Sequence, residues 1–125
     1  MYFVTTFFTS IFIIIYLLLT IFAIIARKKA GIPIGSGGDE NLLRASRAHS
    51  SFIEHTIFFL ISIFLLEING VNQVYLYIVG LIFVIARIFH AISFYLRKGI
   101  FRQLGVIITL VCYISNLVYL IKSLL

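Results

Sequence analysis

Four long runs of apolar residues, separated by short polar segments, restrict the fold of this chain more than any other feature. The runs cover approximately residues 4–26, 42–68, 73–95 and 104–124. Each is close to or longer than the roughly 20 residues that an α-helix needs to cross about 30 Å of hydrocarbon. Their hydrophobicity is continuous rather than alternating, and a helix satisfies its own backbone hydrogen bonds in lipid. The sequence therefore predicts an all-α integral membrane protein, a four-transmembrane-helix bundle that forms one domain over residues 1–125.

The composition supports this fold class and excludes others. Hydrophobic residues make up 62% of the chain and charged residues 11%, and the mean hydropathy is +1.18, which leaves too little polar surface for a water-soluble domain. The net charge of +6 is divided among short clusters rather than one solvated basic face, so we expect no nucleic-acid partner. Because the chain has one cysteine, Cys112, and three histidines on no common face, we expect no internal disulfide and no metal site.

The basic residues predict how the helices are oriented. They cluster after the first run and between the third and fourth runs: Arg27, Lys28 and Lys29, then Arg97, Lys98 and Arg102. The connection between the second and third runs has no basic residue. Because lysine and arginine mark cytoplasmic loops, both basic loops should be cytoplasmic and both termini outside the cytoplasm. The first run should remain as a membrane anchor, since no basic residue precedes it and no small-residue cleavage site follows it.

The second run begins with RASRAHSSFIEHT, residues 44–56, which brings charged side chains toward the membrane. Glu54 lies 14 residues before the end of this run, and Arg87 lies 14 residues after the start of the third run. The short connection makes the two helices antiparallel, so a rise of 1.5 Å per residue places both side chains about 21 Å from the same membrane surface. The same count places Ser51 level with His90, at about 25 Å.

On each of these two helices, the polar residues and Phe94 of the third run share one face. They are Arg44, Arg47, Ser51, Glu54 and His55 on the second, and Arg87, His90, Phe94 and Arg97 on the third. Two such faces at matching depth predict a polar pocket that opens to the cytoplasm. A charge at this depth costs about 2.5–3.5 kcal/mol on insertion scales, so we expect it to have a role. One alternative is a structural ion pair between Glu54 and Arg87. The other is a site for an anionic ligand with two carboxylates, which the excess of arginine favours.

Three segments of the chain resemble the MAPEG superfamily, the membrane-associated proteins in eicosanoid and glutathione metabolism. RASRAHSSFIEHT is similar to the R-x-H-x-N-x-x-E segment on the second helix of that family, and ARIFHA, residues 86–91, is similar to its R-x-x-H on the third. FRQLG, residues 101–105, resembles the segment with its arginine at the start of the fourth helix. The likeness covers essentially the whole chain. It resembles small bacterial inner-membrane members more than the mammalian prostaglandin or leukotriene enzymes.

The resemblance implies a homotrimer with three glutathione sites between neighbouring subunits, and a localisation in a bacterial inner membrane. The implied glutathione-binding residues are Arg44, Arg47, Ser51, Glu54, Arg87, His90 and Phe94, and the implied catalytic residue is Arg102. Glu54 would receive the amino group of glutathione and the arginines its carboxylates. Arg102 would lie near the thiol, where a guanidinium stabilises the nucleophilic thiolate. A lipophilic small molecule or lipid would reach the site from the bilayer.

The implied activity is a microsomal glutathione transferase-like or peroxidase-like reaction, in which the thiolate conjugates or reduces a lipophilic electrophile. Two residues depart from the family pattern and affect this expectation. Phe94 stands where several catalytic members carry tyrosine, and Val106 stands where some of them do. Without those hydroxyl groups, thiolate stabilisation depends on Arg102 and backbone donors. The alternative from another class is a non-catalytic membrane protein, with a structural Glu–Arg polar core or a ligand-binding role. A transporter fits less well, because the excess of arginine does not suit cationic drugs.

The predicted orientation can be tested with reporter fusions. Alkaline phosphatase joined after Leu125 should be active and green fluorescent protein at the same position should be dark, because both termini are expected outside the cytoplasm. The same two reporters joined after Lys98 should give the reverse result. A fluorescent fusion at Leu125 would contradict the predicted topology.

Overall fold

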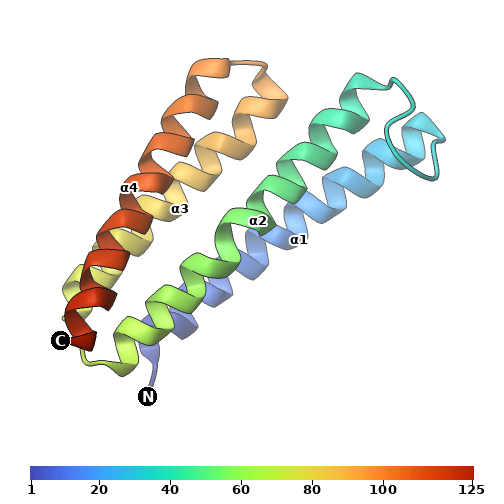
Figure 1. Ribbon diagram of the computed structural model, residues 1–125. Coiled ribbons are helices and arrows are strands. Elements are labelled where there is room, and N and C mark those ends of the chain that lie inside the picture. Colours follow the sequence, from blue (N-terminus) through green and yellow to red (C-terminus); the bar gives the residue numbers. More distant parts are fainter.

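The computed structural model describes all residues, 1–125, and consists of four long α-helices without strands. The helices are α1 (Phe3–Ala30), α2 (Glu40–Ile68), α3 (Gln73–Leu96) and α4 (Gly99–Leu124). Each is long and apolar enough to cross a membrane. This architecture confirms the predicted all-α membrane protein with four spanning helices (Figure 1).

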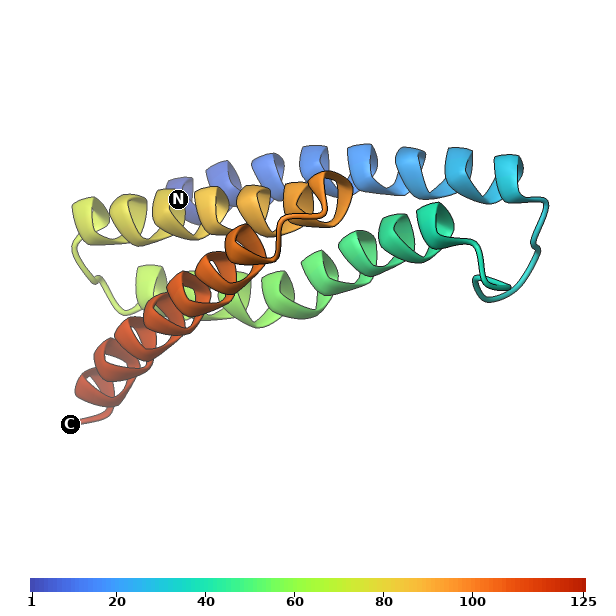
Figure 2. The same ribbon diagram turned by 90° about the horizontal axis from the view of Figure 1, so that it is seen from above.

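The helices form two antiparallel pairs, α1 with α2 and α3 with α4. The pairs approach each other at the end that holds both termini and the α2–α3 connection, and they diverge toward the other end (Figure 1). Seen from above, α4 is inclined to the other three helices (Figure 2). We call the diverging end the basic end, because the α1–α2 and α3–α4 connections there adjoin the two clusters of lysine and arginine.

Two helices extend further at the basic end than the apolar runs predict. The first run ends at residue 26, whereas α1 continues through its basic residues to Ala30 and ends at Gly31, whose φ of 67° lies in the left-handed region. The fourth run begins at residue 104, whereas α4 begins at Gly99, so Arg102 lies in its first turn. Hydropathy detects only the segment that matches lipid, but lysine and arginine continue a helix beyond it without penalty.

Aromatic side chains fill the centre of the bundle and join three helices. The rings of Phe59 in α2 and Phe83 in α3 are stacked, with centroids 3.7 Å apart, and Phe12 of α1 meets Phe83 edge-on at 5.7 Å. On α3, Gly80 leaves room for the ring of Phe8, because a Cβ at this position would lie 2.1 Å from that ring. These contacts hold α1 and α2 against α3 near the middle of the helices.

Hydrogen bonds fasten the helices in the half that holds the termini. The hydroxyl of Tyr75 in α3 donates to Oδ1 of Asn116 in α4 at 2.8 Å, and Nδ2 of Asn116 donates to Oγ of Ser62 in α2 at 2.8 Å. The carboxylate of Glu67, near the end of α2, accepts from the backbone N–H groups of Val4 and Thr5 at 2.8 and 2.9 Å. This carboxylate satisfies donors that the first turn of a helix leaves free.

A substitution at Gly105 can test how closely α3 and α4 approach each other. A Cβ at Gly105 would lie 2.9 Å from the carbonyl oxygen of Ala86, a backbone atom that cannot move aside easily. We expect Gly105→Ala to lower the free energy of unfolding by about 1–3 kcal/mol, as overpacking does. Thermal denaturation in detergent measures this loss. The control is Gly99→Ala in the same helix, where a Cβ meets no atom within 4 Å. Equal unfolding midpoints for the two variants would contradict the close contact.

Candidate functional site

A cavity of about 400 Å³ lies at the basic end, between α2 and the ends of α3 and α4 that join each other. Its lining residues are Glu40, Leu43, Arg44, Arg47, Phe94 and Arg102. A smaller cavity of about 230 Å³ adjoins it and shares Arg44, Phe94 and Arg102. The larger volume falls within the range of about 300–1,000 Å³ that is usual for small-molecule sites. Two helices, α2 and α4, therefore bring three arginines to one cavity of suitable size, and α3 supplies Phe94.

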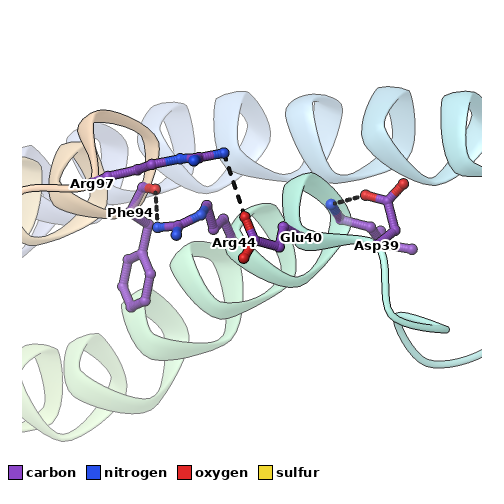
Figure 3. Close-up of polar contacts among 6 residues, drawn as sticks. Asp39, Glu40, Arg44, Phe94 and Arg97 are labelled. Carbon is purple, nitrogen blue, oxygen red and sulfur yellow. Dashed lines mark hydrogen bonds and ion pairs between the residues drawn. The ribbon is translucent and has the colours of Figure 1, made fainter.

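Arg44 is held in place by the end of α3. Its Nη1 donates to the carbonyl oxygen of Phe94 at 3.3 Å (Figure 3). This carbonyl lacks a partner within its own helix, because α3 ends at Leu96 and the last four carbonyls of a helix remain free. The Nε of Arg44 is buried and has no hydrogen-bond partner. Arg44 thus joins α2 to α3 and still has a donor free for another acceptor.

Arg47 and Arg102 face the same cavity from different helices. Arg47 lies one turn after Arg44 in α2, and it is exposed in the single chain. Arg102 lies in the first turn of α4, and its guanidinium carbon is 5.9 Å from the centre of the Phe94 ring. This distance is within the range of cation–π attraction, which holds a guanidinium against an aromatic face. The ring of Phe94 therefore contributes to the position of Arg102.

The cavity keeps an excess of positive charge. Its one acidic residue, Glu40, forms an ion pair with Arg97 at 3.5 Å, and no other ion pair is present in the structure (Figure 3). Arg44, Arg47 and Arg102 have no carboxylate partner within the chain. Guanidinium groups bind carboxylates through pairs of parallel hydrogen bonds. The arrangement can therefore bind an anion that carries one or two carboxylates. No group of three or more histidine, cysteine or acidic side chains lies together as a metal site would require.

The structure brings together some of the residues predicted for the site but not all. Arg44, Arg47, Phe94 and Arg102 line the basic cavity, whereas Ser51, Glu54, Arg87 and His90 do not. Ser51 is half-buried, and its carbonyl oxygen accepts from Nδ1 of His55 at 2.8 Å. His90 is buried, with its ring 5.3 Å from the ring of Phe94. Within one chain, these four residues lie deeper in the helices than the cavity.

The ion pair between Glu54 and Arg87, considered as a structural alternative, does not form within the chain. Glu54 is exposed, and Arg87 is 1% exposed. Nη2 of Arg87 donates to Oγ1 of Thr109 at 2.6 Å and to the carbonyl oxygen of Gly105 at 3.3 Å, so its partners are in α4. The sequence placed Glu54 and Arg87 at the same depth in the membrane, but equal depth does not make two side chains point toward each other. The Nε and Nη1 of Arg87 have no partner.

The role of Thr109 was missed by the sequence analysis. It accepts the hydrogen bond from Arg87 and donates its own hydroxyl proton to the carbonyl oxygen of Gly105 at 2.7 Å. The available signal was a threonine in an apolar run with a glycine one turn earlier, because this pair lets a neighbouring helix approach and gives it an acceptor.

Replacing Thr109 with valine should separate the two possible partners of Arg87. Thr109→Val keeps the volume but removes the 2.6 Å acceptor and leaves Nη2 of Arg87 with only the 3.3 Å bond to Gly105. It should lower the free energy of unfolding by about 1–3 kcal/mol, the range for a lost hydrogen bond to a charged group. Glu54→Gln, the matched control, should change this free energy by less than about 0.5 kcal/mol. Both are measured by thermal denaturation in detergent. A larger loss of unfolding free energy in Glu54→Gln than in Thr109→Val would contradict this assignment and indicate that Arg87 pairs with Glu54.

The comparisons with known proteins agree with the helical architecture. A sequence model of the MAPEG family matches residues 5–122, essentially the whole chain. No curated protein and no solved structure matches the chain. The family match confirms the resemblance inferred from the segments on the second, third and fourth helices. The chain is therefore an integral membrane protein that belongs to the MAPEG family.

Proposed function

We propose that this protein binds glutathione at the basic end and conjugates or reduces a lipophilic electrophile with the glutathione thiolate. The observation that carries the proposal is the convergence of Arg44, Arg47 and Arg102 on one cavity without matching carboxylates. Membership in a family of eicosanoid and glutathione metabolism supports it. Glutathione has two carboxylates and one amino group, so it complements a site with several guanidinium groups and an acid.

We further propose that the site is completed by a neighbouring subunit, as in a homotrimer. Glu54 lies 14 residues before the end of α2, about 21 Å along the helix, and is exposed in the single chain. A charge facing hydrocarbon there would cost about 2.5–3.5 kcal/mol. A second copy of the chain that covers this face of α2 would remove Glu54 from lipid. In this arrangement Ser51 and Glu54 complete the glutathione site, with Glu54 bound to the amino group, whereas Arg87 and His90 are buried within the chain and are not part of this face.

Arg102 is the proposed catalytic residue. Its guanidinium, beside the sulfur of glutathione, would favour the thiolate and lower the pKa of the thiol. The sulfur then attacks an electrophilic carbon, a carbon–sulfur bond forms, and the leaving group departs with its bonding electrons. The thiol proton goes to solvent through the open end of the cavity. With a lipid hydroperoxide, two glutathione molecules would instead become a disulfide, and the peroxide would become an alcohol and water.

Substitutions at Arg47 and Arg102 should have different effects. Arg47→Gln should weaken glutathione binding by about 10- to 100-fold, because a hydrogen bond to a charged group contributes about 1.5–3 kcal/mol. Arg102→Gln should lower kcat by at least about tenfold with a smaller change in the glutathione KM, and should shift the rate profile to higher pH. Calorimetry in detergent measures binding, and conjugation of chlorodinitrobenzene measures the rate.

The control for both variants is Lys28→Gln, which removes one basic charge outside the cavity. It should leave binding and rate unchanged. Absence of glutathione binding by the parent protein would contradict the proposed function. Binding without conjugation of any tested electrophile would instead support a non-catalytic role, the alternative that phenylalanine at position 94 favours because it supplies no hydroxyl group.

A further inference from the structure

A second cavity, of about 530 Å³, lies at the basic end on the side of α2 that faces α1. The last turns of α1, the first turns of α2 and the last turn of α3 surround it. We refer to it as the three-helix groove. It shares Arg44 with the basic cavity of about 400 Å³, but its other lining residues are different. Nothing in the proposed reaction uses this groove.

The part of the three-helix groove nearest the middle of the membrane is apolar and faces outward. Phe22 and Ile25 of α1 are 50% and 44% exposed, and Tyr95 of α3 is 43% exposed. The rings of Phe22 and Tyr95 meet at 6.0 Å, so α1 and α3 form one continuous wall. In a membrane-spanning chain, an exposed apolar wall contacts lipid. Tyrosine is common where hydrocarbon meets headgroups, which is the level expected for the end of α3.

The opposite rim of the groove is basic. Lys29 at the end of α1 and Arg97 after the end of α3 line it together with Arg44. The one acid of the groove, Asp39, is engaged as the cap of α2, where its Oδ1 accepts from the N–H of Leu42 at 2.8 Å (Figure 3). Three cations therefore face one carboxylate that already has a partner.

The ion pair of Arg97 does not prevent it from binding another anion. Its Nη2 lies 3.5 Å from a carboxylate oxygen of Glu40, and the two side chains are 58% and 68% exposed. Pairs this exposed contribute little to stability, because water and salt screen them. Arg97 can therefore exchange this carboxylate for a phosphate at small cost, and Lys29 is exposed without an ion-pair partner.

We propose that the three-helix groove binds an anionic phospholipid of the adjacent leaflet. The phosphate and headgroup bind Lys29 and Arg97, and one acyl chain lies against Phe22 and Ile25. The combination of a basic rim and an apolar wall at the membrane surface matches a molecule that is itself anionic at one end and apolar at the other. A free phosphate would match the rim alone and leave the wall unused. This inference goes beyond the proposed reaction and does not depend on it.

The experiment compares two double variants with the same change in charge. Lys29→Gln/Arg97→Gln removes the rim of the groove, whereas Lys28→Gln/Lys98→Gln removes the neighbouring cations, which do not line it. Purified protein is titrated with phosphatidylglycerol and with phosphatidylcholine, and bound lipid is counted by native mass spectrometry. We expect the parent and the Lys28/Lys98 variant to prefer phosphatidylglycerol, and the Lys29/Arg97 variant to bind it on the order of tenfold more weakly.

Three results would overturn the proposal. They are equal binding of both lipids by the parent, equal loss in the two double variants, and displacement of phosphatidylglycerol by inorganic phosphate. The first would remove the charge selectivity, the second would assign it to the surface as a whole, and the third would reduce the groove to a site for free anions. If the Lys29/Arg97 variant does not fold, Lys29→Gln alone serves, because this side chain forms no hydrogen bond or ion pair within the chain.

Discussion

The hydrogen bonds that join Ser62, Asn116 and Tyr75 determine where this bundle is closed and where it is open. They connect α2 with α4 and α3 in the half that holds both termini, and the stacked rings of Phe59 and Phe83 continue the contact toward the middle. In an apolar solvent, polar groups of this kind bind each other because lipid offers them no alternative partner. At the basic end no hydrogen bond joins α2 to α4, and Arg44 reaches across to a carbonyl oxygen of α3 instead. The cavity with three arginines depends on this difference between the two ends.

Much of the fold could be predicted from the sequence, because the length and hydrophobicity of the four runs leave few alternatives to spanning helices. The ends of α1 and α4 at the basic end could not be predicted in this way. The apolar run ends where charged residues begin, whereas the backbone hydrogen bonds of the helix continue past them. For the site, helical spacing placed Arg44, Arg47 and Phe94 on polar faces and the resemblance added Arg102, and these four residues line one cavity. The alternative of an ion pair between Glu54 and Arg87 was wrong, because Arg87 turns toward Thr109. The rotation of one helix about its axis depends on small contacts such as the one at Gly105, which sequence periodicity does not reveal.

Arginines at the basic end divide between two surfaces with different chemistry. Arg47 and Arg102 line the cavity between α2 and α4. Arg97 lines the groove beside α1 and the smaller cavity at the α3–α4 connection, and Arg44 lines all three. A count of charges would treat all of them as markers of topology. Their surroundings distinguish them. The basic cavity combines guanidinium groups with an aromatic ring, and the three-helix groove combines cations with an apolar wall that faces outward.

The hydrogen bonds of Arg87 to α4 have a consequence for how the chain is assembled. While α3 enters the bilayer during synthesis, its arginine has no partner until the carbonyl of Gly105 and the hydroxyl of Thr109 have also been made. Because an unpartnered arginine is costly in hydrocarbon, we expect α3 and α4 to leave the translocon together as a helical hairpin. The connection between them, at residues 97–98, is short enough for this mode of insertion.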